Sequence, residues 1–233
     1  AHAGLEKWVP GYFGLTIFFF LSGFLITTLL RTEYDRCGHI NLGHFYLRRI
    51  LRIFPPFYLV LGFAMLLTLL GVLAGSLQVK AMLAQFLHLT NYYIIMYGWN
   101  MGTPGTWVYW SLAVEEQFYL LLPLVVRFVP PKRLLPVLLA GVALAPLSRL
   151  ALLEWTRNGT GAAFLLMPCR ADALLLGVLA ASALRSTQVR WQLMRYRAVL
   201  GWLLGLLGAG VVLLACRWPQ AVSRPMALWG RTW

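Results

Sequence analysis

Residues 11–30 read GYFGLTIFFFLSGFLITTLL, a run of twenty residues without one charged side chain. A helix that crosses a bilayer needs about 20 mostly apolar residues, so this run predicts a membrane-spanning helix. Further candidate spans follow along the 233-residue chain, at 56–75, 107–127, 134–153, 162–184 and 198–216. The sequence therefore predicts an all-α fold, a polytopic membrane helical bundle.

The composition supports a membrane protein and excludes several other classes. Hydrophobic residues make up 60% of the chain, against about 45–50% in soluble domains, and only 12% of the residues are charged. This is too apolar for a disordered chain, an ordinary soluble enzyme or a nucleic-acid-binding arm. Three cysteines at unrelated spacings, Cys37, Cys169 and Cys216, predict neither a metal site nor a disulfide framework.

The basic residues, which give a net charge of +13, predict which loops face the cytoplasm. Twelve of the 20 Lys and Arg residues lie in three short links, 31–56, 127–133 and 185–197. The positive-inside rule places these links in the cytoplasm. The first, third and fifth of the six spans then run inward, and the other three run outward.

This orientation is consistent only if residues 81–97 do not cross the membrane. That stretch is apolar but is interrupted by Gln85, His88 and Asn91, and we predict that it does not cross completely. The predicted external links are then 1–10, 76–106, 154–161 and the residues from 217 onward. Because no repeat or low-complexity linker divides the chain, residues 1–233 are predicted to form a single integral-membrane domain.

One predicted span contains two acidic residues at a depth where charge is costly. Glu115 lies about 12 Å from the outer end of the helix, where a charged side chain costs about 2.5–3.5 kcal/mol. Ser111, Glu115 and Tyr119 recur every four residues and share one helix face, whereas Glu116 points about 100° away. Such residues are candidates for a functional site.

A later span carries Arg170 and Asp172, which are two positions apart and therefore do not face each other on a helix. Each needs a partner from another span, and Glu115 or Glu116 is the predicted partner of Arg170. One interpretation is a structural ion-pair network; the other, favoured by the cost of several buried charges, is a polar cavity that water reaches. Arg149, near the outer end of its span, is predicted to extend toward the interface as a structural residue.

A basic segment, HFYLRRILRIFP at 44–55, contains three arginines at helical spacing. They are Arg48, Arg49 and Arg52, and we predict that they form one cationic face. Pro55 and Pro56 are predicted to turn the chain into the next span. The segment is either an anchor on anionic lipid or a cradle for the phosphates of an anionic cofactor, and spacing alone does not decide between them.

Four blocks of this sequence resemble the acyltransferase 3 family of integral-membrane enzymes. They are His2 with Gly14–Thr27, Phe45–Pro55 with its Arg-Arg-x-x-Arg-Ile, Trp110–Tyr119 and Arg170–Gly177. The resemblance implies a bundle of about ten helices. An α-helix suits a membrane because it satisfies its own backbone hydrogen bonds in lipid. The chain has no initiator Met and stops at Trp233, so we expect a fragment that is truncated at both ends.

The resemblance also implies an activity. The family transfers an acyl group, here expected to be acetyl, from cytoplasmic acyl-CoA to a hydroxyl of an extracytoplasmic carbohydrate or related acceptor. The protein is thus expected to be an O-acetyltransferase of the bacterial inner membrane. Its implied partners are membrane lipid, acetyl-CoA and the hydroxyl acceptor, without a metal or nucleic acid.

The resemblance assigns roles to the candidate residues. His2 matches the family's essential histidine and is the implied general base, with Glu115 or Glu116 orienting its imidazole. The three arginines of the basic segment are implied to hold the CoA phosphates. The remaining residues expected in or beside the cavity are Ser111, Tyr119, Arg170 and Asp172. The alternative is a transporter or proton path that uses the same buried charges, although the paired, interrupted repeats of transporters are not seen.

Overall fold

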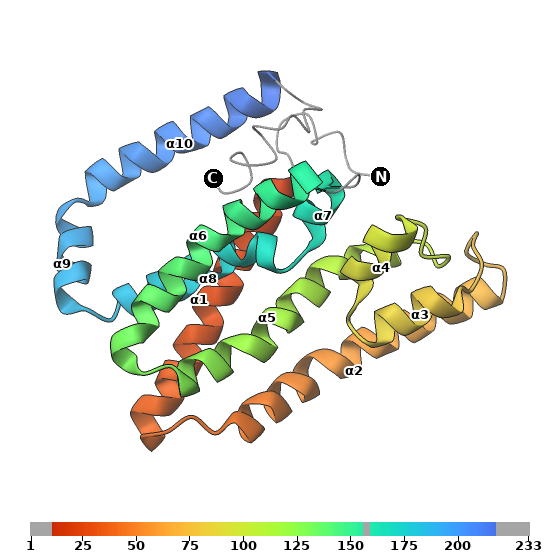
Figure 1. Cartoon of the computed structure of the whole chain (residues 1–233), viewed down its shortest axis with the longest axis horizontal. Coiled ribbons are helices and arrows are strands. Elements are labelled where there is room, and N and C mark those ends of the chain that lie inside the picture. Colours follow the sequence, from red (N-terminus) through yellow and green to blue (C-terminus); the bar gives the residue numbers. More distant parts are fainter. Residues whose placement is uncertain (1–10, 156–158, 218–233) are drawn as a thin grey trace. The chain divides into compact units, whose positions relative to one another are not determined.

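The computed structural model describes residues 11–155 and 159–217 of the chain. Its helices are α1 (Gly11–Cys37), α2 (Leu42–Leu69), α3 (Val79–Phe86), α4 (Thr90–Tyr97), α5 (Tyr109–Phe128), α6 (Pro131–Trp155), α7 (Gly159–Leu165), α8 (Ala171–Ala183), α9 (Thr187–Arg195) and α10 (Arg197–Arg217). Short 3₁₀ turns precede α5 and α8, at Thr106–Val108 and Pro168–Arg170. The described residues form helices and no strand, which confirms the predicted all-α fold (Figure 1).

Several of these helices are long and apolar enough to cross a membrane. Three qualify among the described residues, Gly14–Cys37, Leu42–Leu69 and Lys132–Glu154. A fourth is counted when Gly159–Leu165 and Pro168–Ala183 are taken as one bent span. The helix α5 has 20 residues but does not qualify, because polar residues interrupt its apolar sequence. These apolar helices support a membrane protein, and the inside–outside orientation stays a prediction.

Two predicted spans have different boundaries in the structure. The chain does not turn at Pro55 and Pro56, because α2 continues through both prolines. The φ angle of proline suits a helix, so the cost is confined to the lost hydrogen bonds and the crowding of the preceding turn. The span predicted at 162–184 is not one helix, since its two segments are bent by 70°. Pro168 at the break has no N–H to donate and disfavours a helical residue before it.

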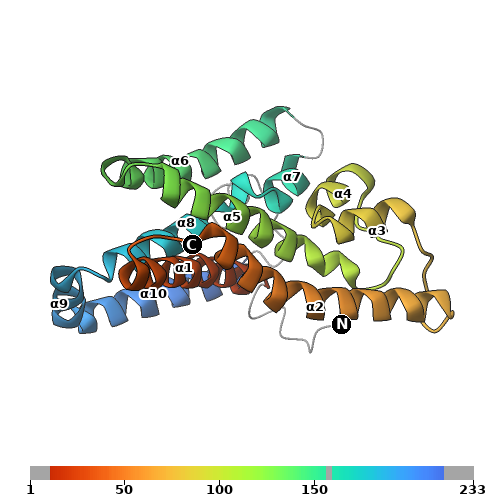
Figure 2. The ribbon, with the colours of Figure 1, turned by 90° about the horizontal axis from the view of Figure 1, so that it is seen from below.

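The described chain divides into two compact units, which we describe separately. The α2–α5 unit consists of Leu30–Leu134 with Phe164–Met167, and the α1/α8 unit contains the other described residues. In the α2–α5 unit, Phe57, Leu61 and Met65 of α2 are buried, and side chains of α3 and α5 pack against them. Figures 1 and 2 show α3 and α5 running beside α2.

Residues 81–97 lie in two short helices rather than one. The helices α3 and α4 have 8 residues each, or about 12 Å of helix, against a hydrocarbon core of about 30 Å. His88 joins them with a left-handed φ of 53°. Neither helix is among the candidate spans, and the prediction that this stretch does not cross stays a prediction.

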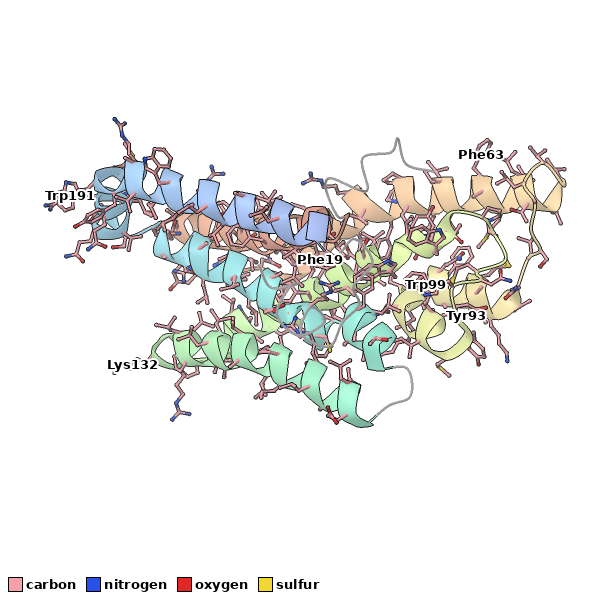
Figure 3. All side chains as sticks on the ribbon, turned by 90° about the horizontal axis from the view of Figure 1, so that it is seen from above. Phe19, Phe63, Tyr93, Trp99, Lys132 and Trp191 are labelled. Carbon is pink, nitrogen blue, oxygen red and sulfur yellow. The ribbon has the colours of Figure 1, made fainter. Side chains whose placement is uncertain are left out.

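In the α1/α8 unit, α1 and α8 pack through glycines. A Cβ on Gly23 would lie 1.9 Å from the carbonyl oxygen of Leu174, and one on Gly177 would lie 2.0 Å from that of Phe20. Only glycine permits two helix backbones to approach so closely. Phe19 of α1 has no exposed surface and lies among other side chains (Figure 3). Two of the four family-like sequence blocks are therefore in direct contact.

Candidate functional site

A buried group of polar side chains joins α2 to α5. Arg49 Nη2 lies 3.3 Å from Glu115 Oε1 and 3.5 Å from Glu116 Oε1. The Arg49 guanidinium also lies over the ring of Tyr119, 3.6 Å from its centroid. The Tyr119 hydroxyl donates a hydrogen bond to Glu115. We refer to these four residues as the carboxylate cluster.

The carboxylate cluster is largely shielded from solvent. The side chain of Glu115 is 7% exposed, and those of Arg49 and Glu116 are each 14% exposed. Within the cluster two carboxylates face one guanidinium, and Arg49 Nε is buried without a hydrogen-bond partner. Because buried charges are costly unless they are compensated, the Arg49 guanidinium offsets part of the cost of burying both carboxylates.

Helix spacing explains how α5 presents these groups. Glu115 and Tyr119 are one turn apart, so the phenol reaches the carboxylate, as the four-residue stripe predicts. Glu116, predicted to point away from this stripe, still shares Arg49 with Glu115, because one guanidinium spans two neighbouring faces. Ser111, the third member of the stripe, donates a hydrogen bond to the backbone oxygen of Val108, in the 3₁₀ turn that precedes α5.

The next residue along α5, Gln117, ties this helix to α4 and to the turn before it. Gln117 Nε2 donates to the backbone oxygen of His88 at 3.2 Å and to Asn91 Oδ1 at 3.1 Å. Asn91 is fully buried and returns a hydrogen bond to Gln117 Oε1. Gln85 similarly donates to the hydroxyl of Thr106 at 2.8 Å. We did not predict these anchors, although polar residues inside an apolar stretch were the signal for them.

His88 packs its imidazole among aromatic rings. Its ring centroid lies 5.0 Å from that of Phe54 and 4.7 Å from that of Phe57. Burial lowers the pKa of His88 below its ordinary value, so the imidazole is neutral at pH 7. The contribution of His88 to the site is its backbone oxygen, which the left-handed turn presents to Gln117.

The three arginines of the basic segment do not share one face, so that prediction is wrong. Arg48 is exposed and forms an ion pair with Glu33 of α1. Arg52 is also exposed, whereas Arg49 is turned into the carboxylate cluster. Arg49 lies on the side of α2 that packs against α5, where acidic side chains compensate its charge.

A second buried ion pair lies in the α1/α8 unit. Arg149 Nη2 donates to Asp172 Oδ2 at 2.8 Å, and Arg149 Nη1 donates to the backbone oxygen of Cys169 at 2.8 Å. Asp172 is thus paired with a residue of another helix, as predicted, and lies in the first turn of α8, where the helix dipole favours an acid. The prediction that Arg149 extends to the interface is wrong, because its side chain is fully buried and Asp172 compensates it.

Arg170 and His2 are two further predicted site residues. Arg170, directly before α8, is buried, and its contact with Glu115 or Glu116 stays a prediction. His2 lies outside the described residues. Within the residues that the structure describes, no group of three or more His, Cys, Asp or Glu side chains is placed to hold a metal ion.

Comparison with known proteins identifies the family. Residues 2–230 match the acyltransferase 3 family model, described as an acyltransferase domain. The chain is 31% identical over 185 residues to O-acetyltransferase OatA of Staphylococcus aureus strain NCTC 8325, an alignment that covers 75% of this chain and 30% of that protein. It is 35% identical over 126 residues to a protein of Staphylococcus aureus strain COL that is provisionally named an O-acetyltransferase, covering 52% of this chain and 21% of that protein.

No solved structure matches the chain. Both relatives are longer than the chain, which spans less than a third of either. The family match, by contrast, covers nearly the whole sequence and includes all four blocks on which the resemblance was based. The chain therefore belongs to the acyltransferase 3 family.

Proposed function

We propose that the chain is the membrane part of an O-acetyltransferase that moves an acetyl group from acetyl-CoA on the cytoplasmic side to a hydroxyl of a carbohydrate outside the membrane. Membership of the family and the names of the relatives support an acyltransferase. The observation that carries the proposal is the carboxylate cluster, in which one arginine and one tyrosine hold two buried carboxylates. Buried ionisable side chains of this kind are typical of functional sites in membrane proteins.

In the proposed reaction His2 is the general base. Its neutral imidazole takes the proton of the acceptor hydroxyl as the hydroxyl oxygen attacks the thioester carbonyl carbon. Glu115 orients the imidazole and stabilises the imidazolium that forms. When the carbon–sulfur bond breaks, the imidazolium returns the proton to the leaving sulfur. The products are the acetyl ester and CoA as its thiol.

Arg49 and Tyr119 are proposed to position the carboxylates rather than to contact substrate. The guanidinium lies within reach of both carboxylates and offsets part of the cost of burying them. The phenol donates to Glu115, which restricts the orientation of that carboxylate. Glu116 is proposed to support the cluster, and Arg170 is a further proposed site residue.

Arg48 and Arg52 are the proposed contacts for the phosphates of CoA, which supplies the acetyl thioester. Both side chains are exposed, and a guanidinium matches the geometry of phosphate oxygens. Arg49 is left out because its charge is already compensated by carboxylates. The phosphates compete with Glu33 for Arg48, since those two side chains form an ion pair.

The deciding experiment measures acetyl transfer from radiolabelled acetyl-CoA to glycan by the full-length protein in detergent. We expect labelled glycan from the wild type and none from His2→Ala, with acetyl-CoA still bound by both. His39→Ala, a change of an exposed histidine, is the matched control and retains transfer. Transfer by His2→Ala at the wild-type rate contradicts the proposed base, and no transfer by the wild type to any glycan contradicts the activity.

A further inference from the structure

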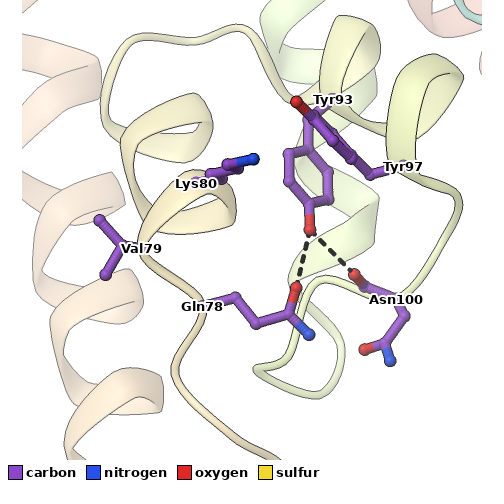
Figure 4. A pocket seen from close by; sticks show the side chains of 6 residues that line it. All are labelled: Gln78, Val79, Lys80, Tyr93, Tyr97 and Asn100. Atoms are coloured by element: carbon purple, nitrogen blue, oxygen red, sulfur yellow. Dashed lines mark hydrogen bonds between the residues drawn. The ribbon is translucent and has the colours of Figure 1, made fainter.

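The link between α2 and α5 carries two cavities that share Asn100. The first, of about 400 Å³, is lined by Gln78, Val79, Lys80, Tyr93, Tyr97 and Asn100 (Figure 4). The second, of about 470 Å³, is lined by residues 74–76, 99–105 and Trp107. Both have the volume of a small-molecule site, and most of this link is predicted to lie outside the membrane.

Two tryptophans form an exposed aromatic wall of the second cavity. Trp99 and Trp107 are 49% and 41% exposed, and their ring centroids lie 5.8 Å apart with the planes at 79°. Both rings line the second cavity, so their exposed faces are accessible to a ligand there. A sugar ring fits this surface, because its C–H face packs on an indole while its hydroxyls stay free to form hydrogen bonds.

The backbone beside the tryptophans is closely packed. The Ser76 N–H donates to the Gly102 oxygen at 3.1 Å, and the Gly102 N–H donates to Asn100 Oδ1 at 3.0 Å. A Cβ on Gly75 would lie 2.1 Å from that same Gly102 oxygen, and Gly102 has a φ of +77°. Both positions therefore require glycine, and the wall of the cavity is preorganised for a ligand.

The first cavity adds a positive charge. Lys80 is the only charged residue between positions 70 and 108, and its ammonium lies 5.1 Å from the centroid of the Tyr97 ring. Figure 4 shows this ammonium directed toward the rings of Tyr93 and Tyr97. The Tyr93 hydroxyl donates to Gln78 Oε1 at 2.8 Å, which fixes that ring. Because no acidic residue of the link neutralises Lys80, an anionic ligand group matches its charge.

We propose that the two cavities together form the acceptor subsite and bind an acidic glycan. One sugar ring covers Trp99 and Trp107, and a carboxylate on a neighbouring sugar pairs with Lys80. Asn100 belongs to both cavities, so one short glycan reaches both. The inference rests on the proposed function, because it identifies the acceptor of that reaction as a carboxylate-bearing glycan.

Binding is measured by calorimetry on the full-length protein in detergent, with tetragalacturonate as the acidic probe and chitotetraose as the neutral one. The wild type is expected to bind the acidic probe more tightly. The double variant Trp99→Ala with Trp107→Ala should weaken both probes at least about tenfold. Lys80→Gln should weaken only the acidic probe, by about two- to fivefold. Trp202→Ala, a change of an exposed tryptophan in α10, is the matched control and leaves binding unchanged.

The outcomes separate this inference from the proposed function. If the tryptophan variant loses glycan binding but the wild type transfers no acetyl group, the subsite is supported and the proposed activity is contradicted. Acetyl transfer by a tryptophan variant with unchanged glycan affinity overturns the subsite and leaves the activity standing. A tryptophan variant that loses membrane insertion but binds both probes normally also overturns it, because the rings are then interfacial anchors. Equal affinity of the wild type for the two probes overturns the role of Lys80.

Discussion

Two buried groups of the same chemistry differ in how their charges are matched. In the α1/α8 unit, Arg149 faces a single carboxylate, that of Asp172, at 2.8 Å, with almost no exposed surface. In the carboxylate cluster of the α2–α5 unit, Arg49 faces two carboxylates at 3.3 and 3.5 Å, and these side chains keep 7–14% of their surface exposed. In one group a guanidinium contacts one carboxylate, and in the other a guanidinium contacts two.

This difference in charge pairing distinguishes a structural ion pair, Arg149 with Asp172, from a group proposed to take part in the reaction, the carboxylate cluster. A short, matched and dry ion pair is fully used in holding two helices together. A cluster with two carboxylates retains the ability to stabilise a charge that develops during a reaction. We therefore expect that breaking the Arg149–Asp172 pair costs stability, whereas changing the carboxylate cluster costs turnover.

The largest effect is expected from Glu115→Gln. The amide keeps the shape of the side chain but removes the charge that stabilises the imidazolium. Acetyl transfer by the full-length protein should fall by about 10²–10⁴, the usual worth of positioned acid–base help. The affinity for acetyl-CoA and the melting temperature should stay near the wild-type values. The measurements are turnover, acetyl-CoA binding and thermal unfolding on the same preparation.

Glu116→Gln is the matched control, because it removes the other carboxylate from the same arginine. We expect a smaller loss of turnover than in Glu115→Gln, because Glu116 is proposed to support the cluster and not to orient the imidazole. A stable but inactive Glu116→Gln beside an active Glu115→Gln reverses the two roles. Full turnover in both variants rules out a carboxylate-assisted histidine.

The second largest effect is expected from Asp172→Asn, and it should appear in stability. The change leaves Arg149 buried without its counter-charge, at a cost of about 3–5 kcal/mol in the free energy of unfolding. Turnover per folded molecule should change little. The double variant Arg149→Met with Asp172→Leu should recover most of the lost stability, because it removes both charges. Lost turnover at an unchanged melting temperature places Asp172 in the reaction instead.

The features predictable from the sequence are those that depend on local spacing. The uncharged run 11–30 indicates a helix, and that run lies in α1. The four-residue spacing of Glu115 and Tyr119 places them in contact on α5. Both inferences need only the length and the angular period of a helix, which the order of residues specifies directly.

Contacts between distant segments were not predictable in the same way. Arg49 meets Glu115 across 66 positions of the chain, and spacing gives the angles between side chains of one helix but not the helix that each face meets. The same limit explains why the sequence predicts an interfacial Arg149, whereas the side chain is buried against Asp172. The break at Pro168 has a different cause, since a hydropathy average does not register the missing N–H of a proline.

An intermediate effect is expected from Gln117→Leu, which tests whether the anchoring of α5 supports the cluster. The change removes the hydrogen bonds to His88 and Asn91 and leaves the buried Oδ1 of Asn91 without the donor Gln117, at a cost of about 1–3 kcal/mol. The melting temperature should fall, and turnover should fall less than in Glu115→Gln. Gln192→Leu on the exposed surface of α9 is the control. An unchanged melting temperature in Gln117→Leu contradicts the anchoring role.

The smallest effect is expected from Arg52→Ala. This change tests whether the exposed Arg52 binds a CoA phosphate, in contrast to Arg49, whose charge is compensated by carboxylates. Arg52 is exposed, so an ion pair with a CoA phosphate is screened by salt and is worth about a two- to fivefold change in affinity. The dissociation constant of acetyl-CoA should rise by that factor at low salt, and the difference from the wild type should shrink as salt is added. Arg190→Ala, a change of an exposed arginine in α9, should have no such effect.

Arg49→Ala should give the opposite result, because that guanidinium is held by Glu115 and Glu116. Turnover should fall, since two buried carboxylates lose their counter-charge, while the affinity for acetyl-CoA and its salt dependence stay the same. Equal losses of acetyl-CoA affinity in Arg49→Ala and Arg52→Ala contradict the division of the basic segment into a compensated and an available arginine. Unchanged affinity in Arg52→Ala and in the Arg48→Ala variant leaves the two exposed arginines as anchors on anionic lipid.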